Sequence, residues 1–130
     1  PVRPPAEPRR APDLAAAVAR ARALLADGQL TEPVVAQALA ANETLFATVA
    51  LACLSGLPVR AVTKVCDTQS AKGIVAVCWR AGLSAELATQ AQVRLLRLPP
   101  AKVIAAWGGG FALAEDEMAW QLEFFGADAP

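Results

Sequence analysis

The residue types that most often perform catalysis or bind metals are scarce in this sequence. It contains no histidine, and its three cysteines, Cys53, Cys66 and Cys78, are separated by twelve and eleven residues rather than arranged in the close pairs that bind zinc. All three lie in apolar segments, which favours buried free thiols. Because free thiols persist in a reducing compartment, we expect a cytoplasmic protein. The missing histidine and the wide cysteine spacing lead us to expect no metal and no cofactor.

Two other motifs have the composition of a reactive site without its context. The glycine run at 108–110 could form a phosphate loop only with a preceding strand and a following Lys-Ser/Thr pair, whereas Phe111 follows it. We expect a flexible hinge there instead. The acidic run at 115–117 suits the first turn of a helix, where the helix dipole favours negative charge. Because no nucleophile motif such as G-x-S-x-G occurs either, we predict that the protein is not an enzyme.

The charges of this chain cancel in total but are distributed unevenly. Residues 60–102 hold seven basic residues against two acidic ones, whereas residues 103–130 hold five acidic residues and no basic one. This separation is compatible with ordinary solvated faces or with distinct contact surfaces. The basic residues that we consider as a candidate basic face are Arg60, Lys64, Lys72, Arg80, Arg94, Arg97 and Lys102.

The pattern along the chain predicts one helical domain behind an extended segment. Residues 1–12 hold half of the ten prolines together with three arginines, which indicates a linker. From residue 13 to 126, apolar residues recur at helical spacing without strand-like alternation, so we predict a single all-α domain of about seven to eight helices. No apolar run reaches membrane-spanning length without a charge or a Gly/Pro break, and we recognise no signal peptide, so we expect no membrane association.

Three helix boundaries are expected towards the end of the domain. One helix should run from Ser84 to the Pro99-Pro100 pair, which stops it. A short helix should then reach Trp107, and the last helix should run from residue 112 to 125. We expect Trp79 and Trp107 to lie in the core.

Two predicted corners between helices share a Gly-Leu pair. The pair at 56–57 ends one apolar helix, and the pair at 82–83 ends another one 26 residues later. A glycine just past a helix end adopts the left-handed conformation, and the apolar residue after it folds back onto the last turn. Pro58 and Ser84 suit the start of the helices that follow. Two such corners indicate stacked helical hairpins, either HEAT-like or as an irregular helical bundle.

The corner at Pro58 also matches the spacing of a helix-turn-helix. Ala52, Gly56 and Val62 supply the small residue, the turn glycine and the β-branched residue of that motif. In a DNA-binding protein Arg60 and Lys64 would then face the major groove. The corner at Gly82 nearly repeats this spacing, which favours generic corner geometry, and the chain lacks the dense basic surface typical of DNA-binding proteins.

The predicted last helix has an unusually wide apolar arc. One face holds Phe111, Ala114, Met118, Leu122 and Phe125, and a neighbouring face holds Leu113, Trp120 and Phe124. Both faces could dock on the domain's own core, or the second could bind a partner. Since Trp and Phe dominate interface energies, we treat Trp120, Phe124 and Leu113 as candidate partner-binding residues.

Three segments are similar to a known family. The stretches from Ala23 to Thr31, from Leu45 to Pro58 and from Gly73 to Leu83 resemble the alphaproteobacterial domain of unknown function 2336, and the likeness covers about residues 20–98. The resemblance implies an all-helical, repeat-like domain within larger bacterial proteins. It implies no established activity, so no functional residue is carried over. The resemblance does not extend past Pro99: we do not recognise the segment from Trp107 to Phe111 or the last helix in that family.

Together these observations favour a non-catalytic, cytoplasmic helical module for protein–protein interaction or regulation, within a larger bacterial protein. We expect it to bind a protein partner or to self-associate, with Trp120 and Phe124 as anchors and charged residues steering the encounter. The alternative is a DNA-binding regulator of helix-turn-helix type that uses the Pro58 corner. Its affinity would fall steeply with salt and would require Arg60 and Lys64.

Overall fold

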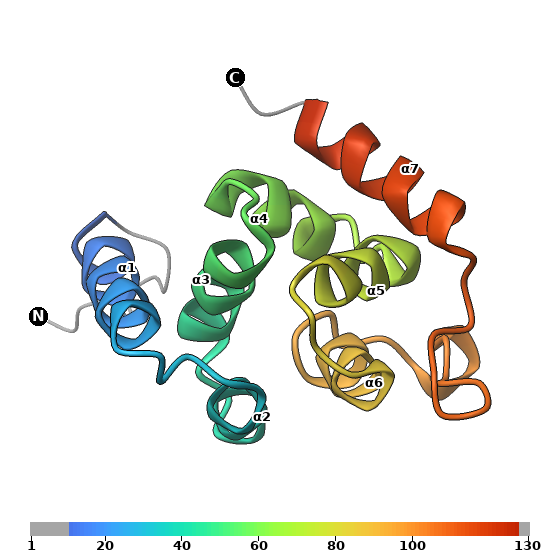
Figure 1. Cartoon of the computed structure of the whole chain (residues 1–130), viewed down its shortest axis with the longest axis horizontal. Helices are drawn as coiled ribbons and strands as arrows, with labels where there is room; N and C mark the ends of the chain where they lie inside the picture. Colours follow the sequence, from blue (N-terminus) through green and yellow to red (C-terminus); the bar gives the residue numbers. More distant parts are fainter. Residues whose placement is uncertain (1–10, 128–130) are drawn as a thin grey trace, which may run out of the picture.

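The structure, a computed structural model, describes residues 11–127. These residues form seven α-helices and one short 3-10 helix, and they contain an isolated bridge between Trp107 and Gly110 but no strand (Figure 1). The prediction of an all-α domain is confirmed. The elements are α1 (Ala11–Ala26), α2 (Glu32–Ala40), α3 (Thr44–Ser55), α4 (Val59–Asp67), α5 (Ala71–Arg80), α6 (Ala85–Arg94), η1 (Pro100–Lys102) and α7 (Glu115–Ala127).

Two apolar helices form the centre of the fold. α3 packs against α1, α2, α4 and α5, and α5 in turn packs against α3, α4, α6 and α7. The seven consecutive residues 46–52 of α3 and the six residues 73–78 of α5 are buried, so neither helix keeps a polar face in these segments. Helices that are apolar all round must be covered on all sides. The remaining helices therefore enclose α3 and α5, with α1 and α7 at opposite ends of the molecule (Figure 1).

Both predicted Gly-Leu corners have the expected geometry. Gly56 and Gly82 adopt left-handed φ angles of 76° and 78°. At the second corner the backbone N–H of Leu83 donates to the carbonyl of Cys78 at 3.0 Å, and Leu83 is buried. This pattern satisfies the carbonyls that a helix end leaves without partners. Ser84 then caps α6, because its Oγ accepts a hydrogen bond from the backbone N–H of Leu87 at 3.1 Å.

The predicted helix that reaches Trp107 does not form, and α6 ends at Arg94 rather than at the proline pair. A buried side chain explains why the segment around Ile104 is not helical. The amide of Gln92 donates to the carbonyl of Ile104 at 2.8 Å and accepts from its backbone N–H at 2.7 Å. Gln92 thus satisfies both backbone groups of Ile104, as a neighbouring strand would, and holds this segment extended.

The glycines at 108–110 lie in a closed turn. Gly108 and Gly109 have φ angles of 58° and 82°, and Trp107 and Gly110 exchange two backbone hydrogen bonds of 2.8 and 2.9 Å. Positive φ at both central residues defines a type I′ turn, which glycine adopts without strain. α7 begins only at Glu115, three residues later than expected, so the turn is not directly joined to the helix. Flexibility of this segment stays a prediction.

A carboxylate links two elements that are distant in sequence. Glu32, the first residue of α2, accepts hydrogen bonds from the backbone N–H of Ser84 at 2.8 Å and from its hydroxyl at 2.6 Å. The negative charge of Glu32 therefore lies at the N-terminus of α6, where the helix dipole favours it. This contact fixes α2 against α6.

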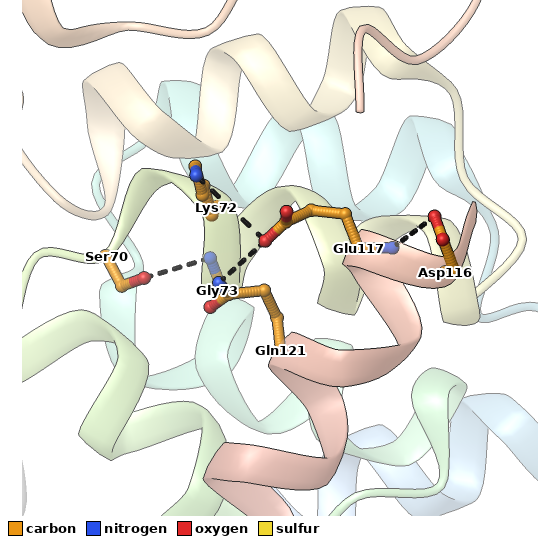
Figure 2. A network of polar contacts seen from close by, with 6 residues as sticks. All are labelled: Ser70, Lys72, Gly73, Asp116, Glu117 and Gln121. Atoms are coloured by element: carbon orange, nitrogen blue, oxygen red, sulfur yellow. Dashed lines mark hydrogen bonds and ion pairs between the residues drawn. The ribbon is translucent and has the colours of Figure 1, made fainter. Parts of the chain in front are cut away.

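The terminal helix, α7, docks on α5 at Gly73, which has no side chain. Met118, Leu122 and Phe125 of α7 are buried, and Phe125 lies over Gly73. A methyl group added to Gly73 would come within 2.8 Å of Cε2 of Phe125. The backbone N–H of Gly73 donates to Oγ of Ser70 at 3.0 Å, which caps α5 at the same point (Figure 2). Gly73 is required for this close approach of the two helices.

We predict that Gly73→Ala lowers the free energy of unfolding by about 1–3 kcal/mol, although alanine is the better helix former, because overpacking outweighs propensity. Chemical denaturation measures this effect. Gly126→Ala is the matched control, since its added methyl group would meet Leu57 at an ordinary 3.9 Å. Equal stability of the wild type and Gly73→Ala would contradict the packing described.

We also predict that Glu32→Ala destabilises the domain by about 1–2 kcal/mol, because the N-terminus of α6 loses two charge-assisted hydrogen bonds. Thermal unfolding, converted to free energy, measures the change. Glu86 provides the control, since it lies exposed in the first turn of the same helix. If Glu86→Ala costs as much as Glu32→Ala, the link between α2 and α6 contributes nothing beyond the helix dipole.

Candidate functional site

The clearest candidate surface is a pair of aromatic side chains on the outer face of α7. Trp120 and Phe124 are 58% and 51% exposed, although both are large and apolar. Their rings stack with centroids 5.7 Å apart and an angle of 18° between the planes. Phe124 also meets the buried Phe125 edge to face at 5.1 Å. The exposed pair is thereby anchored to the core by Phe125 and held in a defined orientation.

Helical geometry accounts for this arrangement. Residues four apart lie on the same side of a helix, so Trp120 stacks with Phe124 while Phe125 points inward with Met118. The surroundings of the pair are acidic: Glu115, Asp116 and Glu123 are exposed on α7. The outer face of α7 is therefore an apolar ridge with two carboxylates at its N-terminal end and a third, Glu123, beside it.

The third predicted partner-binding residue does not belong to this face. Leu113 lies before the first residue of α7 and is half-buried against the core. Phe111, expected on the inner face of the helix, also precedes α7 and packs on the core. Because the helix starts at Glu115, the helical spacing that grouped Leu113 with Trp120 does not apply.

The residues of the candidate basic face are exposed but come from separate parts of the fold. α4, which carries Arg60 and Lys64, packs against α3, α5 and α7, whereas α6, which carries Arg94, packs against α2 and α5. Arg80 lies at the C-terminal end of α5, about 12 Å along the helix axis from Lys72. The structure thus spreads these charges over several helices, with Arg97 and Lys102 exposed in the segments after α6.

One of these basic residues faces α7. Nζ of Lys72 lies 4.0 Å from Oε2 of Glu117, which also accepts a hydrogen bond from the amide of Gln121 at 3.3 Å (Figure 2). This pairing of α5 with α7 neutralises Glu117. It leaves the other acidic residues of α7 to determine the charge of its outer face.

The Pro58 corner has some of the features that DNA binding would need. Arg60 and Lys64 are exposed on α4, and Thr63 is half-buried. Pro58 occupies the N-cap position of α4 rather than its first turn. α4 is flanked by three other helices, so its exposed side is limited to a narrow stripe. DNA binding stays a prediction.

An ion pair between α1 and the start of α3 was not predicted. Arg20 Nη1 lies 2.9 Å from Oε1 of Glu43, and the Arg20 guanidinium lies 3.9 Å from the centroid of the buried Phe46 ring. Open hollows of about 390 and 360 Å³ flank this pair. They are lined largely by small and apolar residues such as Ala17 and Leu24, and the interaction stabilises the packing of α1 on α3.

The cysteines are placed as core residues. Cys66 and Cys78 are buried and Cys53 is half-buried, and the described part of the chain holds no cluster of residues that could bind a metal. Burial, with smaller contributions from the charges of Glu32 and Cys66, raises the pKa of the Cys78 thiol to about 12. This thiol is therefore neutral in the folded protein.

The two remaining tryptophans differ from each other. Trp79 is half-buried against the core, in the expected environment. Trp107 is 79% exposed beside the glycine turn, so its expected place in the core was wrong. The predicted short helix is absent, and Trp107 instead forms the first position of the glycine turn, whose backbone it closes with Gly110.

The fold and the family comparison agree on the class of protein. This is an all-helical domain, and the family described as "Uncharacterised protein conserved in bacteria (DUF2336)" matches residues 2–106. The chain belongs to this family, as the resemblance indicated, and the match extends further in both directions than the expected 20–98. No curated protein and no solved structure gives a significant match. Trp107, Trp120 and Phe124 all lie beyond the matched residues.

None of the helices between residues 11 and 127 combines the length and the apolar character needed to cross a membrane.

We predict that Cys78 does not react with a thiol reagent at about pH 8 while the protein is folded, because a buried thiol with a raised pKa supplies almost no thiolate. Mass spectrometry of peptides from the labelled protein identifies the modified cysteines. Labelling in denaturant, where all three thiols are accessible, serves as the control. Modification of Cys78 under native conditions at the rate seen in denaturant would contradict its burial.

Proposed function

We propose that this domain is a non-catalytic module for protein–protein interaction or regulation within a larger bacterial protein, and that it works in the cytoplasm. The observation that carries the proposal is the stacked pair of exposed aromatic rings, Trp120 and Phe124, on a helix whose opposite side is docked on the core. Large aromatic side chains release the most free energy when a partner removes them from water, and they dominate the energetics of protein interfaces.

The free energy available from covering the two exposed rings is sufficient for recognition. Covering the exposed part of each ring would remove about 100 Å² of apolar surface from water, which is worth about 2–3 kcal/mol per ring. Two such anchors, held by Phe125 and by the docked helix, lose little conformational entropy on binding. The ridge on α7 therefore offers a preformed anchor rather than one that a partner must order.

The distribution of charge is consistent with this role. The outer face of α7 is acidic, and Lys72 neutralises only Glu117. Charges at the rim of an interface mainly steer the encounter and select the partner, whereas the buried aromatic rings provide the affinity. No specific feature of the structure favours DNA binding over this function.

The proposal is tested by capture from a nuclease-treated bacterial lysate with tagged wild type and with Trp120→Ser/Phe124→Ser. We expect a stoichiometric protein bound by the wild type to be reduced by at least about tenfold with the double variant, because hot-spot truncations are costly. Circular dichroism should show an unchanged fold, since both side chains are largely exposed.

The matched control is Leu25→Ser/Val93→Ser, which removes two exposed apolar side chains from α1 and α6. It should bind the partner as the wild type does. Equal capture by the Trp120→Ser/Phe124→Ser variant, or capture that occurs only when nuclease is omitted, would contradict the proposal.

A further inference from the structure

The outer face of α7 has a regular pattern of acidic, small and aromatic residues. Exposed residues on it fall in two adjacent rows with four-residue spacing, Asp116-Trp120-Phe124 and Glu115-Ala119-Glu123. Four residues of a helix surface at such positions enclose a hole that accepts one side chain of a facing helix. On α7 such a hole is bounded by Asp116, Ala119, Trp120 and Glu123.

The floor and the rim of this hole differ in chemistry. Because the side chain of Ala119 is short, the hole is shallow on that side, and the Trp120 ring forms an apolar wall on the other. An aliphatic side chain of moderate length fits into this hole. Glu115 and Glu123 bracket Ala119 and lie about 12 Å apart along the helix axis. Neither glutamate forms an ion pair with another described residue. Their charges are available to a partner.

We propose that this face of α7 binds a basic amphipathic helix of another protein. In this complex an aliphatic side chain of the partner enters the hole beside Trp120 and covers the Trp120–Phe124 pair. Lysine or arginine residues placed about two helical turns apart on the partner pair with Glu115 and Glu123. The inference rests on the proposed function and specifies the chemistry of its partner.

A helical partner fits better than an extended one. An extended peptide that binds by strand addition gains its affinity from the hydrogen-bonding edge of a sheet. α7 is a helix whose backbone groups already bond to one another, so it offers no such edge. A helix satisfies its own backbone and needs only side-chain contacts from α7.

Charge disfavours a second copy of α7 and an anionic surface as the occupant. α7 carries four acidic residues and no basic one. Pairing two α7 helices would bring these like charges together, which opposes association. Nucleic acids and anionic lipids would be repelled for the same reason.

The experiment is a selection from a displayed library of helical peptides with randomised surface positions, with the full chain as bait. Parallel selections use Trp120→Ser/Phe124→Ser and Glu115→Lys/Glu123→Lys. The charge control is Asp27→Lys/Glu86→Lys, which changes the net charge equally at exposed positions outside α7. Light scattering of the wild type and of the aromatic variant reports self-association.

We expect peptides enriched by the wild type to carry aliphatic residues flanked by Lys or Arg about two turns apart. They should bind the aromatic variant at background level and Glu115→Lys/Glu123→Lys about tenfold more weakly, since two attractive pairs become repulsive. Binding to Asp27→Lys/Glu86→Lys should be unchanged. Added salt should weaken binding to the wild type.

Two kinds of failure can be told apart. The first kind is a set of enriched peptides that need Trp120 and Phe124 but show no preference for basic residues, or a wild-type dimer that the aromatic variant loses. Either result would overturn the basic helix as partner and leave the aromatic surface intact. If no enriched peptide depends on Trp120 and Phe124, and no dimer forms, the proposed function itself fails.

Discussion

The close contact between α5 and α7 at Gly73 is the constraint on which the candidate site depends. Only the absence of a side chain at this position lets the Phe125 ring lie against α5. Once Phe125 is fixed inward, the rotation of about 100° per residue of a helix turns Phe124 by about 100° and Trp120 by about 140° away from it, towards solvent. The orientation of the aromatic surface is therefore a consequence of packing in the core, and the helix presents this surface without further ordering.

Long-range polar contacts keep the rest of the scaffold in register. Glu32 joins α2 to α6, and Gln92 holds Ile104 extended after α6. Gln69, at the end of α4, donates from its amide to the carbonyl of Leu96 at 2.9 Å. Each contact satisfies backbone groups that helices alone leave without partners. Apolar packing of α3 and α5 supplies the bulk of the burial, and these contacts determine how the connecting segments run.

The sequence is sufficient to predict features that depend on local rules. The all-α class, the two Gly-Leu corners and the Ser84 cap follow from spacing and from the conformational freedom of glycine. The spacing on the last helix leaves open whether Trp120 and Phe124 dock on the core or face outward, because that depends on how the helix packs. The extended segment around Ile104 could not be predicted, because it depends on Gln92, whose burial is decided by tertiary packing. Gly73 looks like an ordinary residue inside a helix until Phe125 is placed over it, and the exposure of Trp107 follows from the missing helix before it.

The most direct test of the aromatic surface is the nuclear magnetic resonance spectrum of the three tryptophan indole N–H groups when a captured protein partner is added. The chain contains three tryptophans, so the signals can be assigned by single substitutions. We expect the Trp120 signal to shift strongly, because its ring becomes covered, while the half-buried Trp79 signal stays in place. An unchanged Trp120 signal at saturating partner would contradict the central role of α7.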